Sequence, residues 1–182
     1  IDGKVCFGNR EPCVLGEGKN FIHLLGDSHL GALSPSFVDK LSDNYRLSVL
    51  QSGECLPVLH VQKYRAGPGN VVDENCDLDF QMLRYEFIKA NPGLVIVLAR
   101  YPVYLSDGVF FDNQEGGIEQ DTYRPMISTR GYSIAEEFEQ YVVSLSEISG
   151  VSVAILNSVP EVGFHVTRAS MKRYLRGNNN LF

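Results

Sequence analysis

The sequence has no excess of positive charge, no long apolar run and no metal-ligand motif. Its 16 Lys and Arg residues are outnumbered by 22 Asp and Glu residues, which gives a net charge of −6. An acidic surface repels phosphates, so we expect no nucleic-acid partner. The longest apolar run, residues 94–99, is far shorter than the ~20 residues of a membrane-spanning helix. No C-x-x-C pair and no Cys/His cluster of zinc-finger spacing occurs, so we expect no metal and no other cofactor.

The composition is typical of one folded domain. The chain has 182 residues, of which 44% are hydrophobic and 21% are charged, and both values are close to globular averages. A domain of this length can bury about 70% of its unfolded surface, so it needs no metal to fold. We therefore expect a single domain over residues 1–182. The sequence opens at Ile1 without a Met or a signal peptide, and we expect it to be a mature or excised segment of a longer protein.

Four cysteines bear on the cellular compartment. They allow three pairings, and the pairing with the shortest loops joins Cys6 to Cys13 and Cys55 to Cys76. Both loops contain turn-forming residues, and the Gly- and Pro-rich stretch between Cys55 and Cys76 would be loose without a bridge. Four buried free thiols in a cytosolic protein are the alternative. We favour two disulfides, the first in an N-terminal segment over residues 1–19, which places the domain in the periplasm or outside the cell.

Apolar periodicity predicts an alternation of strands and helices. The expected strands are 21–25, 46–50, 94–98 and 151–156, of which the first, third and last have the apolar character of buried strands. The expected helices are 30–41, 78–90 and 134–148, the last with Ser133 as its N-cap. Residues 1–19 and 54–77 are expected to be irregular, and 105–131 is a long polar segment. This alternation is typical of an α/β domain with a parallel sheet, whose ligands bind beyond the carboxyl ends of the strands.

The turn after the first expected strand contains a candidate nucleophile. Ser28 stands in the run Gly26-Asp27-Ser28-His29, at the amino end of a helix. Its backbone N–H and the helix dipole would favour negative charge on a substrate oxygen. Gly26 allows a tight turn, and Asp27 can hold the loop by accepting backbone N–H bonds. The alternative is an ordinary helix cap, because both Ser28 and Asp27 are good residues for a cap or turn.

The turns after the second and third strands contain two further candidates. Gly53, in Ser52-Gly53-Glu54, would let a backbone N–H come close to a bound group and serve as an oxyanion donor, although a plain loop glycine is the alternative. Arg100 directly follows the third strand. Because burying an unpaired arginine is costly, its side chain must reach solvent, a carboxylate or a ligand. A salt bridge and a ligand contact both remain open for Arg100.

These turns together resemble the SGNH, or GDSL-type, serine hydrolase superfamily, and in particular the extracytoplasmic SGNH domain fused after the membrane helices of acyltransferase-3 proteins. The resemblance spans nearly the whole chain. The segments that carry it are 24–29, 53–57 with the partner Cys76, 99–101 with Tyr104, 159–163, and the Cys6–Cys13 pair ahead of the first strand.

The resemblance implies a flavodoxin-like three-layer α/β/α sandwich with Ser28 as nucleophile. The N–H groups of Ser28 and Gly53 would be oxyanion donors. Members of the superfamily usually have an Asn after the third strand, where this chain has Arg100, so Arg100 is the candidate third donor. Asp27, His29 and Tyr101 would support the site.

One part of the family pattern is missing. The superfamily's Asp-x-x-His block, which supplies the general base and the residue that orients it, occurs nowhere in this sequence. The chain ends at Phe182, before the last strand and helix expected of the fold, so we expect it to lack them. Among the histidines, we expect His23 and His29 to be structural and His60 to lie at the rim of the site. His165 is the best substitute, although no Asp lies three or four residues away to orient it.

Three functions are compatible with these residues. The first is serine-dependent O-acyl transfer, with acetyl as the expected group, to a cell-surface polysaccharide. The acyl donor would then come through a fused transmembrane acyltransferase domain that tethers the protein to the inner membrane. The second is a secreted GDSL-type esterase acting on carbohydrate, and the third is a glycan-binding module without catalysis. The first two share the Ser28 nucleophile, and they differ in whether transmembrane helices precede this domain.

Overall fold

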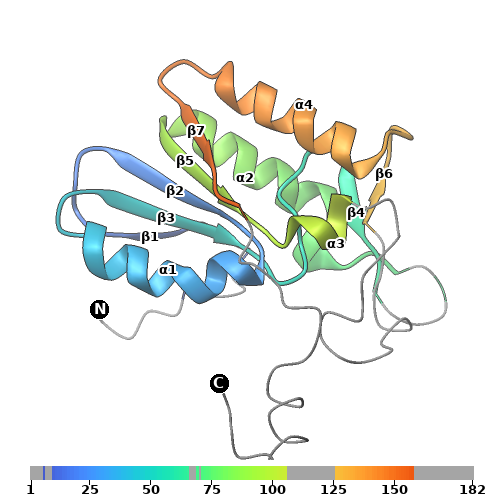
Figure 1. Ribbon diagram of the computed structural model, residues 1–182, viewed down its shortest axis with the longest axis horizontal. Coiled ribbons are helices and arrows are strands. Elements are labelled where there is room, and N and C mark those ends of the chain that lie inside the picture. Colours follow the sequence, from blue (N-terminus) through green and yellow to red (C-terminus); the bar gives the residue numbers. More distant parts are fainter. Residues whose placement is uncertain (1–5, 7–9, 66–68, 70, 106–125, 158–182) are drawn as a thin grey trace, which may run out of the picture.

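The computed structural model describes residues 6, 10–65, 69, 71–105 and 126–157. Its elements alternate along the chain as the apolar pattern predicts (Figure 1). In order they are β1 (Cys13–Leu15), β2 (Phe21–Gly26), α1 (Ser28–Leu41), β3 (Arg46–Gln51), β4 (Val61–Lys63), the 3-10 helix η1 (Glu74–Cys76), α2 (Leu78–Ala90), β5 (Gly93–Leu98), α3 (Tyr101–Leu105), β6 (Met126–Ser128), α4 (Ile134–Ser146) and β7 (Ser152–Ile155).

The central sheet has five strands in the order β1-β3-β2-β5-β7. The pairs β3–β2, β2–β5 and β5–β7 are parallel, and β1 pairs antiparallel with the other side of β3. Strand β2 lies in the middle, with Gly26 beside Gln51 of β3 on one side and Leu98 of β5 on the other. The carboxyl ends of these three strands therefore meet at one edge of the sheet, as the sequence predicts.

Helices cover both faces of the sheet, which confirms the expected α/β/α sandwich (Figure 1). On one face, Leu30 and Val38 of α1 pack against alternate strand residues such as Leu24, Leu47 and Ile96. On the other face, the intervening strand residues pack against α2 and α4. None of the described helices is long and apolar enough to cross a bilayer.

Three short strands lie in segments where the sequence predicts none. Strand β1 is part of the N-terminal segment, next to a disulfide between Cys6 and Cys13. Strands β4 and β6 form a separate two-stranded antiparallel sheet, with Val61 beside Ser128 and Lys63 beside Met126. Each of these strands has three residues, which is too short for an alternating apolar pattern to stand out. Pairing with distant strands determines them instead.

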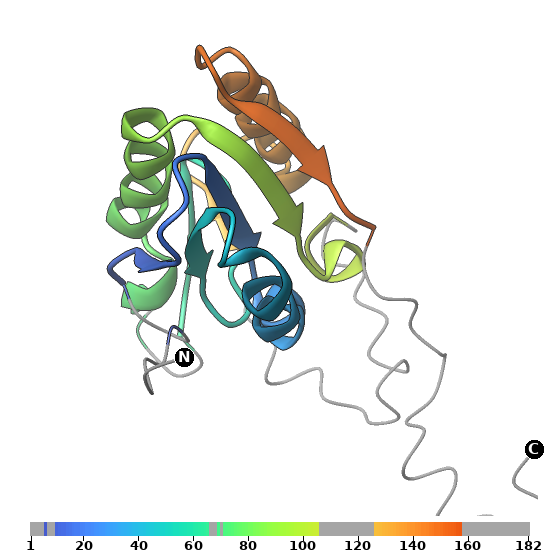
Figure 2. The same ribbon diagram turned by 90° about the vertical axis from the view of Figure 1, so that its left-hand side faces the viewer.

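Strand β7 is more exposed than its apolar sequence predicts. It was expected to be a buried strand, but only its middle residues, Val153 and Ala154, are half-buried, and Ile155 is 48% exposed. The reason is its position, because among the described strands β7 pairs only with β5 and forms an edge (Figure 2).

The helix ends follow the sequence closely. Helix α2 has the predicted bounds, and α4 begins after Ser133 as expected. The Ser133 hydroxyl accepts a hydrogen bond from the N–H of Glu136, whose carboxylate accepts one from the N–H of Ser133. This reciprocal capping box pairs two N–H groups that the start of a helix otherwise leaves without acceptors.

The buried His23 links three elements of the core. Its Nε2 lies 2.7 Å from the backbone oxygen of Asn91, at the end of α2, and its Nδ1 lies 2.6 Å from Oγ of Ser48 on β3. The carbonyl oxygen can only accept, so Nε2 carries the proton and Nδ1 of the neutral ring accepts from the Ser48 hydroxyl. Burial lowers the pKa of His23 below its usual 6.5. His23 is therefore a structural residue, as expected.

This pKa shift predicts a loss of stability in mild acid. Below pH 6.5 the unfolded chain binds a proton at His23 that the folded chain does not, so the free energy of unfolding falls as the pH falls. The slope from this one group is at most about 1.4 kcal/mol per pH unit, the value for one whole proton. We expect His23→Gln to unfold more readily at pH 7.5 but to lose this part of the slope between pH 6.5 and 5. Urea denaturation at several pH values measures both slopes, and equal slopes would contradict the prediction.

Candidate active site

Ser28 lies exposed at the first turn of α1, where β2 passes into the helix. Asp27, not Ser28, is the N-cap of this helix, which decides against Ser28 as a cap. Within the described part of the chain, the Ser28 hydroxyl makes no hydrogen bond. The serine is thus accessible, and it lies at the amino end of the helix, where the helix dipole is positive.

The glycine before this turn is required by the sheet. A Cβ atom on Gly26 would lie 1.9 Å from the backbone oxygen of Leu98 on β5. The sequence suggested that Gly26 serves a tight turn, but its φ is not in the left-handed region. The close approach of β2 and β5 is the actual constraint, and it fixes where the Ser28 turn begins.

Asp27 connects the Ser28 turn to the end of β5. Its side chain is 1% exposed. Oδ1 accepts a hydrogen bond from the N–H of His29 at 2.8 Å, and Oδ2 accepts from the N–H of Arg100 at 3.0 Å and the hydroxyl of Tyr104 at 2.8 Å. Three donors compensate the buried carboxylate for lost hydration. Asp27 thus links the start of α1 to the segment after β5.

The Gly53 turn begins at the same level of the sheet. The N–H of Ser52 donates to the backbone oxygen of Gly26 at 3.3 Å, so the two turns leave neighbouring strands side by side. A Cβ atom on Gly53 would meet no described atom within 4 Å. Among the described residues, the space that a Gly53 side chain would occupy is therefore open. Glu54 follows in the left-handed region, with φ of 53°, and its carboxylate pairs with Nζ of Lys63 at 2.5 Å.

The other predicted site residues have mostly structural contacts. The backbone N–H of Arg100 is occupied by Asp27, so an oxyanion role for Arg100 would fall to its guanidinium. The Tyr101 hydroxyl donates to the backbone oxygen of Val97 at 3.0 Å, and its ring packs on Phe138 of α4. Burial raises the pKa of Tyr101. His29 has its Nδ1 buried, with no hydrogen-bond partner among the described residues.

The general base is not assigned by the described residues. His23 is excluded because it is buried in the core on the α2 side of the sheet. His60, with φ of 61°, directly precedes β4, and its backbone oxygen accepts from Thr129 next to β6. His165 lies outside the described residues. The described part of the chain contains no cluster of His, Cys, Asp and Glu that could hold a metal ion.

The sequence analysis did not assign a role to Tyr104, although Tyr104 is part of the segment after β5 that resembles the family. Its hydroxyl is the one side-chain donor to Asp27 among the described hydrogen bonds. The spacing could have indicated it, because Tyr104 is four residues after Arg100 and residues one helical turn apart lie on the same face of a helix.

The hydrogen bond from Tyr104 to Asp27 predicts an unequal effect of two similar substitutions. Tyr104→Phe removes a bond to a buried carboxylate and is expected to lower the free energy of unfolding by about 1.5–3 kcal/mol. Tyr101→Phe, the matched control in α3, removes a bond to a neutral carbonyl and is expected to lower it by about 0.5–1.5 kcal/mol. Urea denaturation of both variants at pH 7 provides the comparison. Equal losses would show that Asp27 does not depend on the Tyr104 hydroxyl.

The comparison with known families agrees with this geometry. Residues 2–181 match the family model described as "SGNH domain (fused to AT3 domains)". No curated protein and no solved structure gives a significant match. The family match covers almost the entire sequence, and the mostly parallel sheet flanked by helices has the architecture of an SGNH hydrolase. The chain therefore belongs to the family of SGNH domains that occur fused to AT3 domains.

Proposed function

We propose that this domain transfers an O-acyl group, with acetyl as the expected group, to a cell-surface polysaccharide, and that Ser28 is the nucleophile. The observation that carries the proposal is the exposed Ser28 at the start of α1, on a turn that the buried Asp27 fastens to the end of β5. The neighbouring Gly53 turn is open on its outer side. A nucleophile and two candidate oxyanion donors thus belong to one edge of the sheet.

In the proposed reaction, Oγ of Ser28 attacks the carbonyl carbon of an acyl donor and its proton passes to a general base. The N–H groups of Ser28 and Gly53 stabilise the oxyanion that forms. The donor's leaving group departs with a proton and leaves an acyl-serine. A sugar hydroxyl then attacks this ester, gives up its proton to the base, and Oγ of Ser28 is released with a proton restored. An esterase would differ only in this second half, where water replaces the sugar.

We propose that the general base in this reaction is the side chain of a histidine. His165 is the candidate within this sequence, and the alternative is a histidine of an Asp-x-x-His block on another polypeptide segment. The absence of that block from this sequence is the observation that favours the second candidate function, a glycan-binding module without catalysis. A serine without a base loses several orders of magnitude in rate, so labelling of the serine separates the two functions.

The proposed context is extracytoplasmic. The family consists of SGNH domains fused to AT3 domains, which favours an acyl donor supplied by a transmembrane acyltransferase part of the same protein. The two disulfides, Cys6–Cys13 and Cys55–Cys76, favour an oxidising compartment. We therefore propose that the domain acts in the periplasm or outside the cell, tethered to the membrane in the full-length protein.

The test of the nucleophile uses two serines of the same helix. We expect a fluorophosphonate to label Ser28 in the full-length protein, and Ser28→Ala to remove both the label and acyl transfer, by about 10³-fold or more in rate. Ser36, which is exposed on α1, provides the control, because Ser36→Ala leaves the turn unchanged. Intact-mass analysis locates the label. Unchanged acyl transfer in Ser28→Ala would contradict the proposal and favour the non-catalytic module.

Gly53 allows a second test that separates catalysis from folding. The space around its outer side accepts a methyl group, so Gly53→Ala is expected to change the free energy of unfolding by less than about 0.5 kcal/mol. The same methyl group stands beside the N–H that a substrate oxygen must reach. We expect the acyl-transfer rate to fall by about tenfold or more. Wild-type rates in Gly53→Ala would show that the reacting carbonyl does not approach this turn.

A further inference from the structure

The position of the Gly53 amide depends on the loop that carries it. On the strand side, Ser52 is fixed by its hydrogen bond to Gly26. Gly53 itself has open space where a side chain would be, so packing around it contributes little. The next residues behave differently, because Cys55, Leu56 and Val58 are completely buried. What holds residues 55–58 therefore also limits how far the Gly53 turn can move.

Gln81 of α2 makes two hydrogen bonds to the backbone of this buried stretch. Its Oε1 accepts from the N–H of Val58 at 3.2 Å, and its Nε2 donates to the backbone oxygen of Leu56 at 2.9 Å. The side chain is 1% exposed. Because one amide group pairs with both a donor and an acceptor of the loop backbone, it fixes the loop in two directions. Without Gln81, both backbone groups would be buried and unpaired.

Arg84, one turn further along α2, fixes the orientation of the Gln81 amide. Its NH1 donates to Oε1 of Gln81 at 3.2 Å, so Oε1 receives two donors and Nε2 is left to face Leu56. Burial lowers the pKa of Arg84 to about 10, which leaves it protonated at neutral pH. The guanidinium carbon lies 4.1 Å from the centre of the Phe80 ring, whose face attracts the charge.

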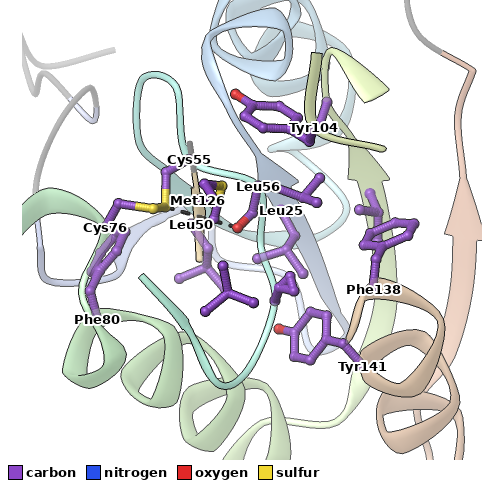
Figure 3. Packing of buried hydrophobic residues seen from close by; sticks show 14 of the residues in the cluster. Leu25, Leu50, Cys55, Leu56, Cys76, Phe80, Tyr104, Met126, Phe138 and Tyr141 are labelled. Atoms are coloured by element: carbon purple, nitrogen blue, oxygen red, sulfur yellow. Dashed lines mark hydrogen bonds between the residues drawn. A yellow bond between two sulfur atoms is a disulfide. The ribbon is translucent and has the colours of Figure 1, made fainter. Parts of the chain in front are cut away.

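A disulfide connects the same loop to the beginning of α2. Cys55 bonds to Cys76, which ends η1 directly ahead of Asp77, the N-cap of α2. Figure 3 shows this disulfide beside Phe80, at one end of the buried cluster, with Phe138 and Tyr141 of α4 at the other end. The loop is therefore attached to α2 twice, covalently through Cys76 and by hydrogen bonds through Gln81.

We propose that Gln81 is a positioning residue, which holds the backbone amide of Gly53 in place through its hydrogen bonds to Leu56 and Val58. Its role in catalysis rests on the function proposed above, because Gly53 is there an oxyanion donor. Gln81 does not touch the substrate in this proposal. Its substitution should change turnover more than substrate binding, since the oxyanion forms only after the substrate is bound.

The test compares three variants of α2. Gln81→Met keeps a similar volume but loses both loop bonds. Gln81→Glu keeps the acceptor for Val58 and the partner for Arg84 but loses the donor to Leu56. Ile88→Val, a buried position two turns along the same helix, lowers stability without removing a hydrogen bond to the loop and is the matched control.

Two measurements are made on each variant. The first is the ¹⁵N order parameter of Gly53 in the purified chain, which we expect to fall from about 0.85 to below about 0.6 in Gln81→Met. The second is acyl transfer by the full-length protein, for which we expect kcat to fall by about tenfold or more with KM nearly unchanged. Gln81→Glu should lie between wild type and Gln81→Met. Ile88→Val should match wild type in both measurements.

The outcomes are distinguishable from a failure of the proposed function. If Gln81→Met leaves the Gly53 order parameter as in Ile88→Val, the proposal is overturned, whatever the kinetics. If the order parameter falls but kcat does not, the amide of Gly53 is positioned by Gln81 and is not the oxyanion donor, so the proposed use of Gly53 fails. If even the wild-type full-length protein transfers no acyl group, the proposed function fails, and the order parameter still decides whether Gln81 holds Gly53.

Discussion

The candidate site depends on the hydrogen bonds of the buried Asp27 carboxylate. A charge that is 1% exposed is tolerated only with a full set of donors, and these come from the start of α1, the residue after β5 and the side chain of Tyr104. Two of the donors, Arg100 and Tyr104, lie on the segment after β5 and the third lies at the start of α1, so the carboxylate is satisfied only when both segments are in place. The placement of Ser28 follows from this, because it stands between Asp27 and His29.

A second set of contacts organises the neighbouring turn. The loop after β3 is bonded to β2 through Ser52 and to α2 through Gln81 and the Cys55–Cys76 disulfide. The Ser28 turn is thus held by contacts with the segment after β5, and the Gly53 turn is held by contacts with α2. The two halves of the candidate site also share one buried cluster, which contains Tyr104 together with Cys55 and Leu56.

The sequence predicted those features that local pattern determines. Buried parallel strands are continuous apolar runs, the stop at residues 91–93 is a turn signal, and Ser133 with Glu136 is a capping pattern, so strands β2, β3 and β5 and helix α2 were predictable. Because parallel strands end at one edge, so was the grouping of Ser28, Gly53 and Arg100. The short strands β4 and β6, the exposure of β7 and the hydrogen bonds of Tyr104 and Gln81 depend on which distant segments meet, and a local pattern does not contain that information.

The two residues before Ser28, the proposed nucleophile, differ in kind from the serine itself. Gly26 is required because a Cβ there would lie 1.9 Å from the backbone oxygen of Leu98, and Asp27 is required by the donors around it, whereas Ser28 is exposed and makes no hydrogen bond among the described residues. Gly26 and Asp27 are therefore required by the structure, whereas the role proposed for Ser28 is chemical. We expect that Ser28 can be substituted with little change in the free energy of unfolding and with the same fold. A Gly-Asp pair in a related sequence therefore does not by itself indicate that the proposed chemistry is retained.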